Sequence, residues 1–266
     1  MLDEKTTQPK EKMMLKRTLA VQLYTLRNEA AKFGMKYVLK AVADIGYMGV
    51  EPAGWGGMTP QDFKKACDDL GLEIVSAHGI PCAPENIDEG IALAKELGLK
   101  HIICGYGGAE FKDLDAIKRT AERTSIVADK VEAAGLILAQ HNHAHEFEYL
   151  DGKLKYDIYA ELCPKVKFQL DIYWSTNFFK NSEVEVIEHF NDRIELLHLK
   201  DGIGTGRIHM RPLGEGKLDI PGAMAASPDH IQSVIVELDD TPYNQIIALQ
   251  RSYDYMTAYG LGIGYR

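Results

Sequence analysis

The sequence predicts a single-domain α/β fold, a (β/α)₈ TIM barrel, and three observations carry this expectation. The chain has 266 residues, and barrels of this class routinely fold about 250 residues as one domain. Short apolar segments alternate eight times with helix-like segments along the chain. The apolar segments, such as Val234–Val236, are nearly continuous in apolar character, which is typical of parallel strands buried on both faces. An open dinucleotide-binding sheet would instead need GxGxxG after the first strand, and the segment VQLYTLR contains no glycine.

The first four strand–helix units are bounded by recognisable helix starts and stops. Thr59 fits an N-cap and Pro60 the first helical position. Gly46, Gly71 and Gly98 each follow the last periodic residue of a helix-like segment. We therefore expect, in order, strand 19–23, helix 35–45, strand 49–52, helix 60–70, strand 74–78, helix 85–97, strand 101–105 and helix 114–134.

The second half of the chain repeats this scheme after Gly135. The predicted elements are strand 137–141, a short helix near 158–162, strand 166–171, helix 183–190, strand 194–200, a short helix after Pro221, strand 234–237 and a final helix from Pro242. Strand and helix alternating in this way favour the barrel over two separate domains.

The ends and the composition of the chain define the remaining organisation. Residues 1–18 are polar and mixed in charge, so we expect a flexible leader there and the barrel over residues 19–266. This opening is too polar for the apolar centre of a signal peptide, and no apolar run approaches the roughly 20 residues of a membrane span. The sequence predicts a cytoplasmic protein without a membrane partner. Its four cysteines lack CxxC spacing and are expected to be free thiols.

The net charge argues against nucleic acid as a partner. The chain carries 30 Lys+Arg against 39 Asp+Glu, a formal charge of −9. A surface of this sign repels polyanions. We therefore expect a small molecule rather than DNA or RNA as the ligand.

Carboxylates and an imidazole follow four successive predicted strands. Glu146, Asp171, His198 and Glu237 lie at or just after the carboxyl ends of strands five to eight, where a TIM barrel builds its active site. Such groups are costly to bury unless they are paired or bind a cation. Three carboxylates and one imidazole suit a divalent ion, Mn²⁺ first, with Mg²⁺, Co²⁺, Zn²⁺ or Fe²⁺ as alternatives. Each residue taken singly has a structural interpretation as well, so the prediction depends on the set.

Six segments of the chain, together with the alternation, resemble a known superfamily. They are VQLYTLR, HNHAHEFE, QLDIYW, LLHLKD, PLGEGKLD and VIVELD. They resemble the xylose-isomerase-like TIM-barrel superfamily of sugar phosphate isomerases and epimerases, from about Leu19 to the final helix. Members typically bind one divalent metal through a Glu, an Asp, a His and a Glu on strands five to eight. The resemblance assigns the last three roles to Asp171, His198 and Glu237.

The fifth strand departs from the pattern of ketose 3-epimerases. These relatives often place the glutamate within the strand, where this chain has Gln140 or His141. The resemblance therefore gives the ligand role to Glu146, with His143 as the alternative. The motif HNHxxEF is similar to a branch that includes uncharacterised sugar isomerases and enzymes acting on 3-keto sugars or inososes.

A metal held in this way can act as a Lewis acid on a keto-sugar that forms an enediolate. Glu237 is the first candidate for the general base, and His143 or Glu146 is the candidate on the opposite face. Two opposed groups would give epimerisation, and one group with a proton donor would give isomerisation or β-elimination. Lys200 is expected to stabilise the enolate or, with Arg211, to orient hydroxyls or a phosphate, although both residues could form rim salt bridges instead.

The remaining candidates are expected to contact the sugar. Trp55 and Trp174 can stack on its apolar face or simply pack at the barrel mouth. Glu51 and His78 can contact substrate or hydrogen-bond to the metal ligands. The full set of predicted substrate-binding residues is Tyr24, Glu51, Trp55, His78, His141, Trp174 and Arg211.

The leading functional prediction is a divalent-metal-dependent sugar isomerase or epimerase. The first alternative is a lyase or dehydratase acting on a 3-keto sugar or inosose, and the second is a barrel that binds sugar without turnover. A metal-dependent abasic-site endonuclease shares the superfamily fold, but the acidic charge argues against it. The resemblance also implies a homodimer or homotetramer.

Overall fold

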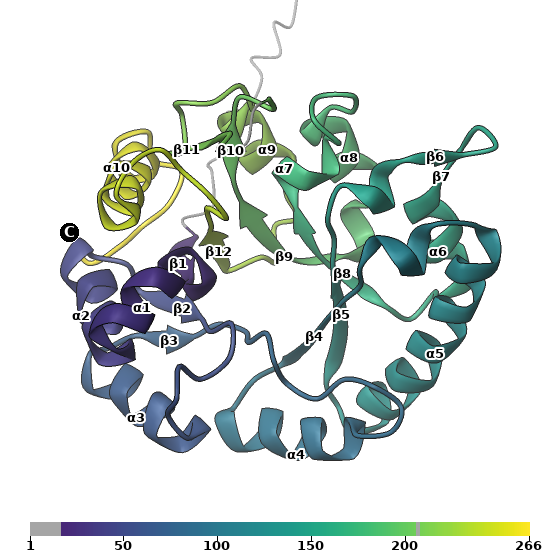
Figure 1. Cartoon of the computed structure of the whole chain (residues 1–266), viewed down its shortest axis with the longest axis horizontal. Helices are drawn as coiled ribbons and strands as arrows, with labels where there is room; N and C mark the ends of the chain where they lie inside the picture. The colour runs from purple at the N-terminus through teal and green to yellow at the C-terminus, as the bar shows by residue number, and fades with distance from the viewer. Residues whose placement is uncertain (1–16, 206–207) are drawn as a thin grey trace, which may run out of the picture.

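The expected (β/α)₈ barrel is confirmed by the computed structural model, which describes residues 17–205 and 208–266. Its strands form a ring around the barrel axis, and the helices lie outside them (Figure 1). The sheet has eight strands in the order β3-β2-β1-β12-β9-β8-β5-β4, and its ladders are parallel. The strands are β1 Thr18–Gln22, β2 Gly49–Glu51, β3 Glu73–Ile74, β4 His101–Gly105, β5 Ile137–His141, β8 Lys167–Asp171, β9 Ile194–Leu199 and β12 Ser233–Val236.

Residues of the barrel are already found slightly before the expected boundary at residue 19. Arg17 is buried and Thr18 starts β1. The Arg17 guanidinium donates hydrogen bonds to the backbone carbonyls of Met224, Ser227, Pro228 and Ile231. This side chain therefore ties the amino end of β1 to the segment before β12. The rest of the expected leader, residues 1–16, lies outside the described residues.

The helices follow the predicted order, with local differences. They are α1 Arg27–Phe33, α2 Met35–Ile45, α3 Pro60–Asp69, α4 Ile87–Leu97, α5 Leu114–Ala133, α6 Lys155–Leu162, α7 Ile172–Ser175, α8 Glu183–His189, α9 Ile220–Ala226 and α10 Gln245–Ala258. The Thr59 side chain caps α3 by accepting from the backbone N–H of Asp62, as predicted. The final helix begins at Gln245 rather than Pro242, because the Asn244 side chain caps it there.

Several local features of the fold were not predicted from the sequence, among them the four-residue helix α7 directly after β8. The loop after β1 contains the additional helix α1, which has no buried residue and therefore no strong apolar periodicity. Two short hairpins, β6 Tyr149–Leu150 with β7 Lys153–Leu154 and β10 Asp201–Gly202 with β11 Met210–Arg211, extend the loops after β5 and β9. Short 3₁₀ turns η1 Leu23–Leu26, η2 Gly108–Phe111, η3 His145–Phe147 and η4 Asn191–Arg193 complete the connections.

The third strand is shorter than the expected 74–78. Pro52 follows β2 directly and has no N–H to donate across the ladder. The pairing continues only as an isolated bridge between Ala53 and His78. His78 is thereby still held beside the end of β2, at the mouth of the barrel.

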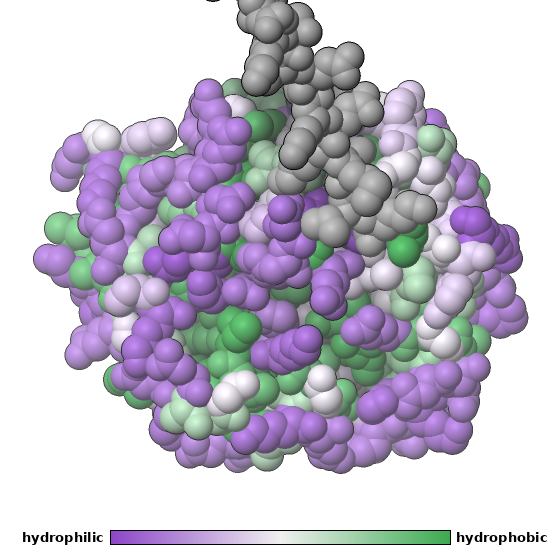
Figure 2. Space-filling view, turned by 180° about the vertical axis from the view of Figure 1, so that it is seen from behind, coloured by the Kyte–Doolittle hydropathy of each residue, from purple (hydrophilic) through white to green (hydrophobic). Residues whose placement is uncertain are grey.

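The apolar core has two layers. Ile103, Ala139 and Leu196 form a small cluster inside the barrel. A much larger cluster lies between the strands and the helices and includes Phe168, which packs against Tyr156 with ring centroids 4.5 Å apart. The outer rim of the face in Figure 2 is mostly hydrophilic, in keeping with helices that bury only one side. Among the described residues, no helix is both long and apolar enough to cross a membrane.

Candidate active site

A cavity of about 650 Å³ opens at the carboxyl ends of the strands. Its walls come from loops and strand ends around the barrel, and the functional groups among them are Gln22, Tyr24, His78, Tyr106, His141, His143, Trp174, Lys200, Glu237 and Asp239. This is the end of the barrel at which TIM-barrel enzymes place their catalytic groups. Apolar walls with a few convergent polar groups are typical of a small-molecule site.

Glu51, at the end of β2, is the buried centre of a hydrogen-bond network below this cavity. Its Oε1 accepts from Gln22 Nε2 at 2.5 Å and lies 2.8 Å from His198 Nε2. Its Oε2 accepts from Gln169 Nε2 at 2.5 Å and from the Ser76 hydroxyl. Residues from four other parts of the barrel thus converge on one carboxylate that is fully buried and does not line the cavity. This arrangement favours the hydrogen-bonding interpretation of Glu51 over direct contact with substrate.

His198, on β9, lies between two carboxylates. Its Nε2 is 2.8 Å from Glu51 and its Nδ1 is 2.7 Å from Glu237 Oε2. Burial disfavours the imidazolium, but the two carboxylates outweigh it and raise the pKa of His198 to about 10. The pKa of Glu51, although burial acts to raise it, is held well below its usual range by His78 and His198. In this state His198 is therefore an imidazolium bridging Glu51 and Glu237.

Lys200 places a second cation among carboxylates at the cavity floor. Its Nζ lies 3.0 Å from Asp171 Oδ2, 3.0 Å from Glu237 Oε2 and 2.7 Å from Asp239 Oδ2. Burial opposes the charge, but these three carboxylates hold the pKa of Lys200 well above its usual range. Glu51, Asp171, Glu237 and Asp239 thus face Lys200 and His198, and His78 Nε2 also lies 3.2 Å from Glu51 Oε1, so four carboxylates surround at most three cations. The cluster keeps an excess of negative charge.

Three of the expected metal ligands lie together. Asp171, His198 and Glu237 each offer a ligand atom within 4.8 Å of the others, and all three side chains are buried. Asp171 Oδ2 is buried without a hydrogen bond, although it faces the Lys200 ammonium. Burial raises the pKa of Asp171. A buried set of two carboxylates and one imidazole, in a cluster with excess negative charge, fits a divalent cation.

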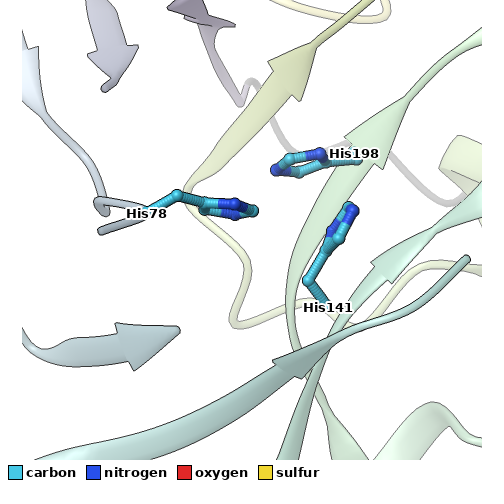
Figure 3. A group of neighbouring side chains, drawn as sticks. All are labelled: His78, His141 and His198. Atoms are coloured by element: carbon cyan, nitrogen blue, oxygen red, sulfur yellow. The ribbon is translucent and has the colours of Figure 1, made fainter. Parts of the chain in front are cut away.

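Two further imidazoles surround His198, and the three rings converge near the barrel axis (Figure 3). His141 lies with its ring centroid 4.7 Å from that of His198, and His78 stacks at 5.7 Å. His78 Nε2 is 2.8 Å from Gln169 Oε1. Burial, followed by the nearby cations, holds the pKa of His141 well below its usual range, and its Nδ1 has no hydrogen-bond partner. His141 is therefore a neutral imidazole at the cavity wall.

Glu146 belongs to a different group of residues from the other expected ligands. The turn η3 folds its carboxylate back onto its own loop, where Oε2 accepts from the His143 backbone N–H at 2.9 Å. Gln140 Nε2 donates to Oε1 at 3.2 Å. The ligand atoms of Glu146 group with those of His143 and His145 rather than with Asp171. Burial raises the pKa of Glu146 to about 8.

The expected substrate-binding residues divide into two sets. Tyr24, His78, His141 and Trp174 line the cavity, whereas Glu51, Trp55 and Arg211 do not. Trp55 packs edge-on against Phe63, with ring centroids 5.6 Å apart. Arg211 donates to the backbone carbonyls of Ile208 and Met210.

Asp239 and Gln22 follow predicted strands, but the sequence assigned neither of them a role in the site. Asp239 Oδ2 accepts from Lys200 and, at 3.1 Å, from Trp174 Nε1, and it lines the cavity. Burial raises the pKa of Asp239 to about 6. The available signal was its spacing, since Asp239 follows Glu237 by two residues beyond the eighth strand. Gln22 likewise interrupts the apolar run of the first strand.

Comparisons with known proteins agree with this architecture. A family model described as xylose isomerase-like TIM barrel matches residues 39–227. Similar solved structures include a sugar phosphate isomerase/epimerase from Parabacteroides distasonis, with a TM-score of 0.72, 22% identity and coverage of 97% of this chain and 99% of that one. A search of curated proteins finds no significant match.

Two other similar structures carry different activities in their names. One is the probable 3-DHS dehydratase AsbF from Bacillus anthracis, with a TM-score of 0.71, 14% identity and coverage of 91% of this chain and 99% of that one. The other is a D-allulose 3-epimerase from Methylomonas sp., with a TM-score of 0.66, 12% identity and coverage of 91% and 98%. At these identities the likeness shows the shared fold.

Proposed function

The chain belongs to the xylose isomerase-like TIM barrel family, and we propose that it is a divalent-metal-dependent sugar isomerase or epimerase. Its substrate is a keto-sugar or sugar phosphate that reacts through an enediolate. The observation that carries this proposal is the buried group of Asp171, His198 and Glu237 beside the Lys200 ammonium, at a cavity of sugar-accommodating size. The similarity to sugar isomerases and epimerases supports it.

The metal would be held by Asp171, His198 and Glu237, with Mn²⁺ as the first choice because carboxylate oxygens predominate. When bound, the ion would supply Lewis-acid activation of the substrate's carbonyl oxygen. Three protein ligands also leave coordination positions open for substrate. Glu51 supports this role of His198, since a carboxylate at Nε2 fixes the ring's orientation and leaves Nδ1 facing Glu237.

Proton transfer is assigned to residues at the cavity wall. Glu237 lines the cavity and is the first general base. The second group is His141 or His143, which both line the cavity and are both neutral because burial lowers their pKa values, to about 4 for His143. They come from the end of β5 and the loop after it, which β8 and β9 separate from β12 in the sheet. Because these groups lie on separate walls of the cavity, one can remove a proton from one face of the sugar and the other can return a proton to the opposite face.

A second candidate reaction is β-elimination from a 3-keto sugar or inosose. Lys200 is the observation that favours it, because its ammonium lines the cavity and is kept protonated by three carboxylates. Such a group can neutralise an enolate and protonate a leaving hydroxyl. Both reactions begin with removal of the proton next to a carbonyl, so one experiment tests their shared step.

The test is solvent exchange in D₂O. We expect the Mn²⁺-loaded protein to incorporate deuterium next to the carbonyl of at least one member of a panel of ketoses, keto-sugars and inososes, detected by NMR. Glu237→Gln should lower the exchange rate by about 10²-fold or more, since it removes the base. Glu188→Gln, an exposed glutamate on α8, is the matched control and should exchange like the wild type. Tight binding of a keto-sugar without any exchange would contradict the proposal and support a sugar-binding barrel.

A further inference from the structure

The loop after β5 gathers three potential metal ligands that lie outside the Asp171–His198–Glu237 group. His143, His145 and Glu146 each offer a ligand atom within 4.8 Å of the others. They lie within four consecutive residues, and His145 and Glu146 are the first two residues of the turn η3. His143 reaches the cavity wall, whereas the Glu146 carboxylate is fully buried.

Glu146 has no strong counter-cation among the residues that the structure describes. Its hydrogen-bond donors, Gln140 Nε2 and the His143 backbone N–H, are neutral. Its sole ion-pair partner in the described part of the chain is His145, 3.2 Å away. A fully buried carboxylate surrounded by neutral donors is costly, unlike Asp171 and Glu237, which face Lys200.

The contact between His145 and Glu146 has the spacing of two ligands of one ion. His145 Nε2 lies 3.2 Å from Glu146 Oε2, yet this nitrogen is buried and makes no hydrogen bond. Metal–ligand bonds of 2.0–2.2 Å place neighbouring ligands of a tetrahedral zinc ion about 3.3–3.6 Å apart. The observed spacing of these two atoms, 3.2 Å, is close to this ligand–ligand distance.

The surroundings of the two imidazoles leave their lone pairs available. Burial lowers the pKa of His145, against an opposing hydrogen bond with the Tyr106 backbone. His145 Nε2 is buried and has no hydrogen-bond partner. His143 Nδ1 is also buried without a partner.

We propose that His143, His145 and Glu146 form a second divalent-cation site, separate from the Asp171–His198–Glu237 group and selective for zinc-like ions. Two nitrogens and one carboxylate oxygen are a ligand set typical of Zn²⁺, with the cavity side open for water or substrate. Asn142 holds this loop against β8. Its side-chain Oδ1 accepts a hydrogen bond from the Asp171 backbone N–H, and its Nδ2 donates one to the Asp171 carbonyl oxygen. The two sites are therefore neighbours on the same wall. With His143 engaged by an ion, His141 carries the proton transfer opposite Glu237.

Zinc stoichiometry tests this proposal independently of any reaction. Chelator-stripped protein is reloaded with Zn²⁺, desalted and analysed by inductively coupled plasma mass spectrometry. We expect about two ions per wild-type chain, about one in His145→Ala and about one in Asp171→Asn. His189→Ala, an exposed histidine on α8 that pairs with Asp157, is the control and should keep both ions.

Two outcomes would overturn the second site. The first is a single ion that Asp171→Asn removes and His145→Ala retains. The second is a single ion that both variants lose, which would mean that one ion is bound jointly by Glu146, its neighbours and the Asp171–His198–Glu237 group.

Circular dichroism of each variant shows whether it folds, and His145→Phe replaces His145→Ala if the alanine variant does not. In Asp171→Asn, Co²⁺ should give the intense visible bands of a low-coordinate site, and their absence would also refute the proposal. Loss of the first ion alone would count against the proposed function and leave this inference intact.

Discussion

Glu51→Gln is the substitution that most severely tests the buried network below the cavity. Glu51 has no exposed surface, and its two oxygens accept from Gln22 and His198 on one side and from Gln169 and Ser76 on the other. A glutamine amide presents one oxygen and one NH₂ group in the same space. Whichever way the amide is turned, its NH₂ therefore meets a donor nitrogen.

The neighbouring amides cannot relieve this clash without breaking other bonds. Gln169 Oε1 is engaged by His78 Nε2 at 2.8 Å, and Gln22 Oε1 accepts from the Tyr24 backbone N–H at 3.0 Å. His198 also loses one of the two carboxylates that stabilise its imidazolium. Breaking a buried ion pair by removing one partner costs about 3–5 kcal/mol. We expect the free energy of unfolding of the metal-free protein to fall by this amount.

The assay is urea unfolding of metal-free protein, followed by circular dichroism, with Glu188→Gln as the exposed control. The pKa of Glu51 is depressed in the folded protein. Its contribution is therefore fully present above the pKa of an unfolded glutamate and is lost as the pH falls through the lower folded value. The stability difference should be largest between the ordinary pKa values of glutamate and histidine. It should shrink in acid and also as the pH rises toward the folded pKa of His198, about 10. A loss below about 1 kcal/mol at pH 7, or a difference that grows in acid, would refute this account of Glu51.

Three further predictions concern other parts of the fold and the site. Lys200→Met should tighten Mn²⁺ binding about tenfold, because the ammonium no longer competes for the carboxylates. The same variant should slow deuterium exchange by about 10²-fold or more, because the cation near the enolate is lost. Weaker Mn²⁺ binding in a chelator competition would contradict this. Arg17→Lys should lower the free energy of unfolding by about 2–4 kcal/mol in urea, since a lysine cannot satisfy four carbonyls in that geometry; an unchanged midpoint would be evidence against it. Gly90→Ala should lower the free energy of unfolding by about 2 kcal/mol despite the better helix propensity of alanine, because a Cβ would lie 1.9 Å from the Pro81 carbonyl oxygen. A raised melting temperature would contradict this prediction.

The strands could be predicted because buried parallel strands leave a strong sequence signal. Continuous apolar runs bounded by glycine and helix caps located seven of the eight strands closely. The third strand was overextended because Pro52, on the neighbouring strand, limits its ladder. The sequence of the third strand itself does not show that a neighbouring residue lacks a backbone N–H.

The loops of the site could be predicted less well. Asp171 and His198 occupy strands, and Glu237 directly follows one, so the barrel's geometry alone brings them together. Glu146 lies in a turn that folds its side chain back to its own backbone, and no periodicity indicates such a turn. The position of Asp239 beside Lys200 likewise depends on the path of the chain beyond β12.

The most direct test of the central claim is the position of manganese in a crystal of the Mn²⁺-soaked protein. Anomalous difference density recorded at the manganese absorption edge locates the ion without reference to activity. The account predicts a peak within bonding distance of Asp171, His198 and Glu237, at the floor of the cavity. No peak there, with Lys200 still paired to Asp171 and Glu237 at saturating Mn²⁺, would contradict it.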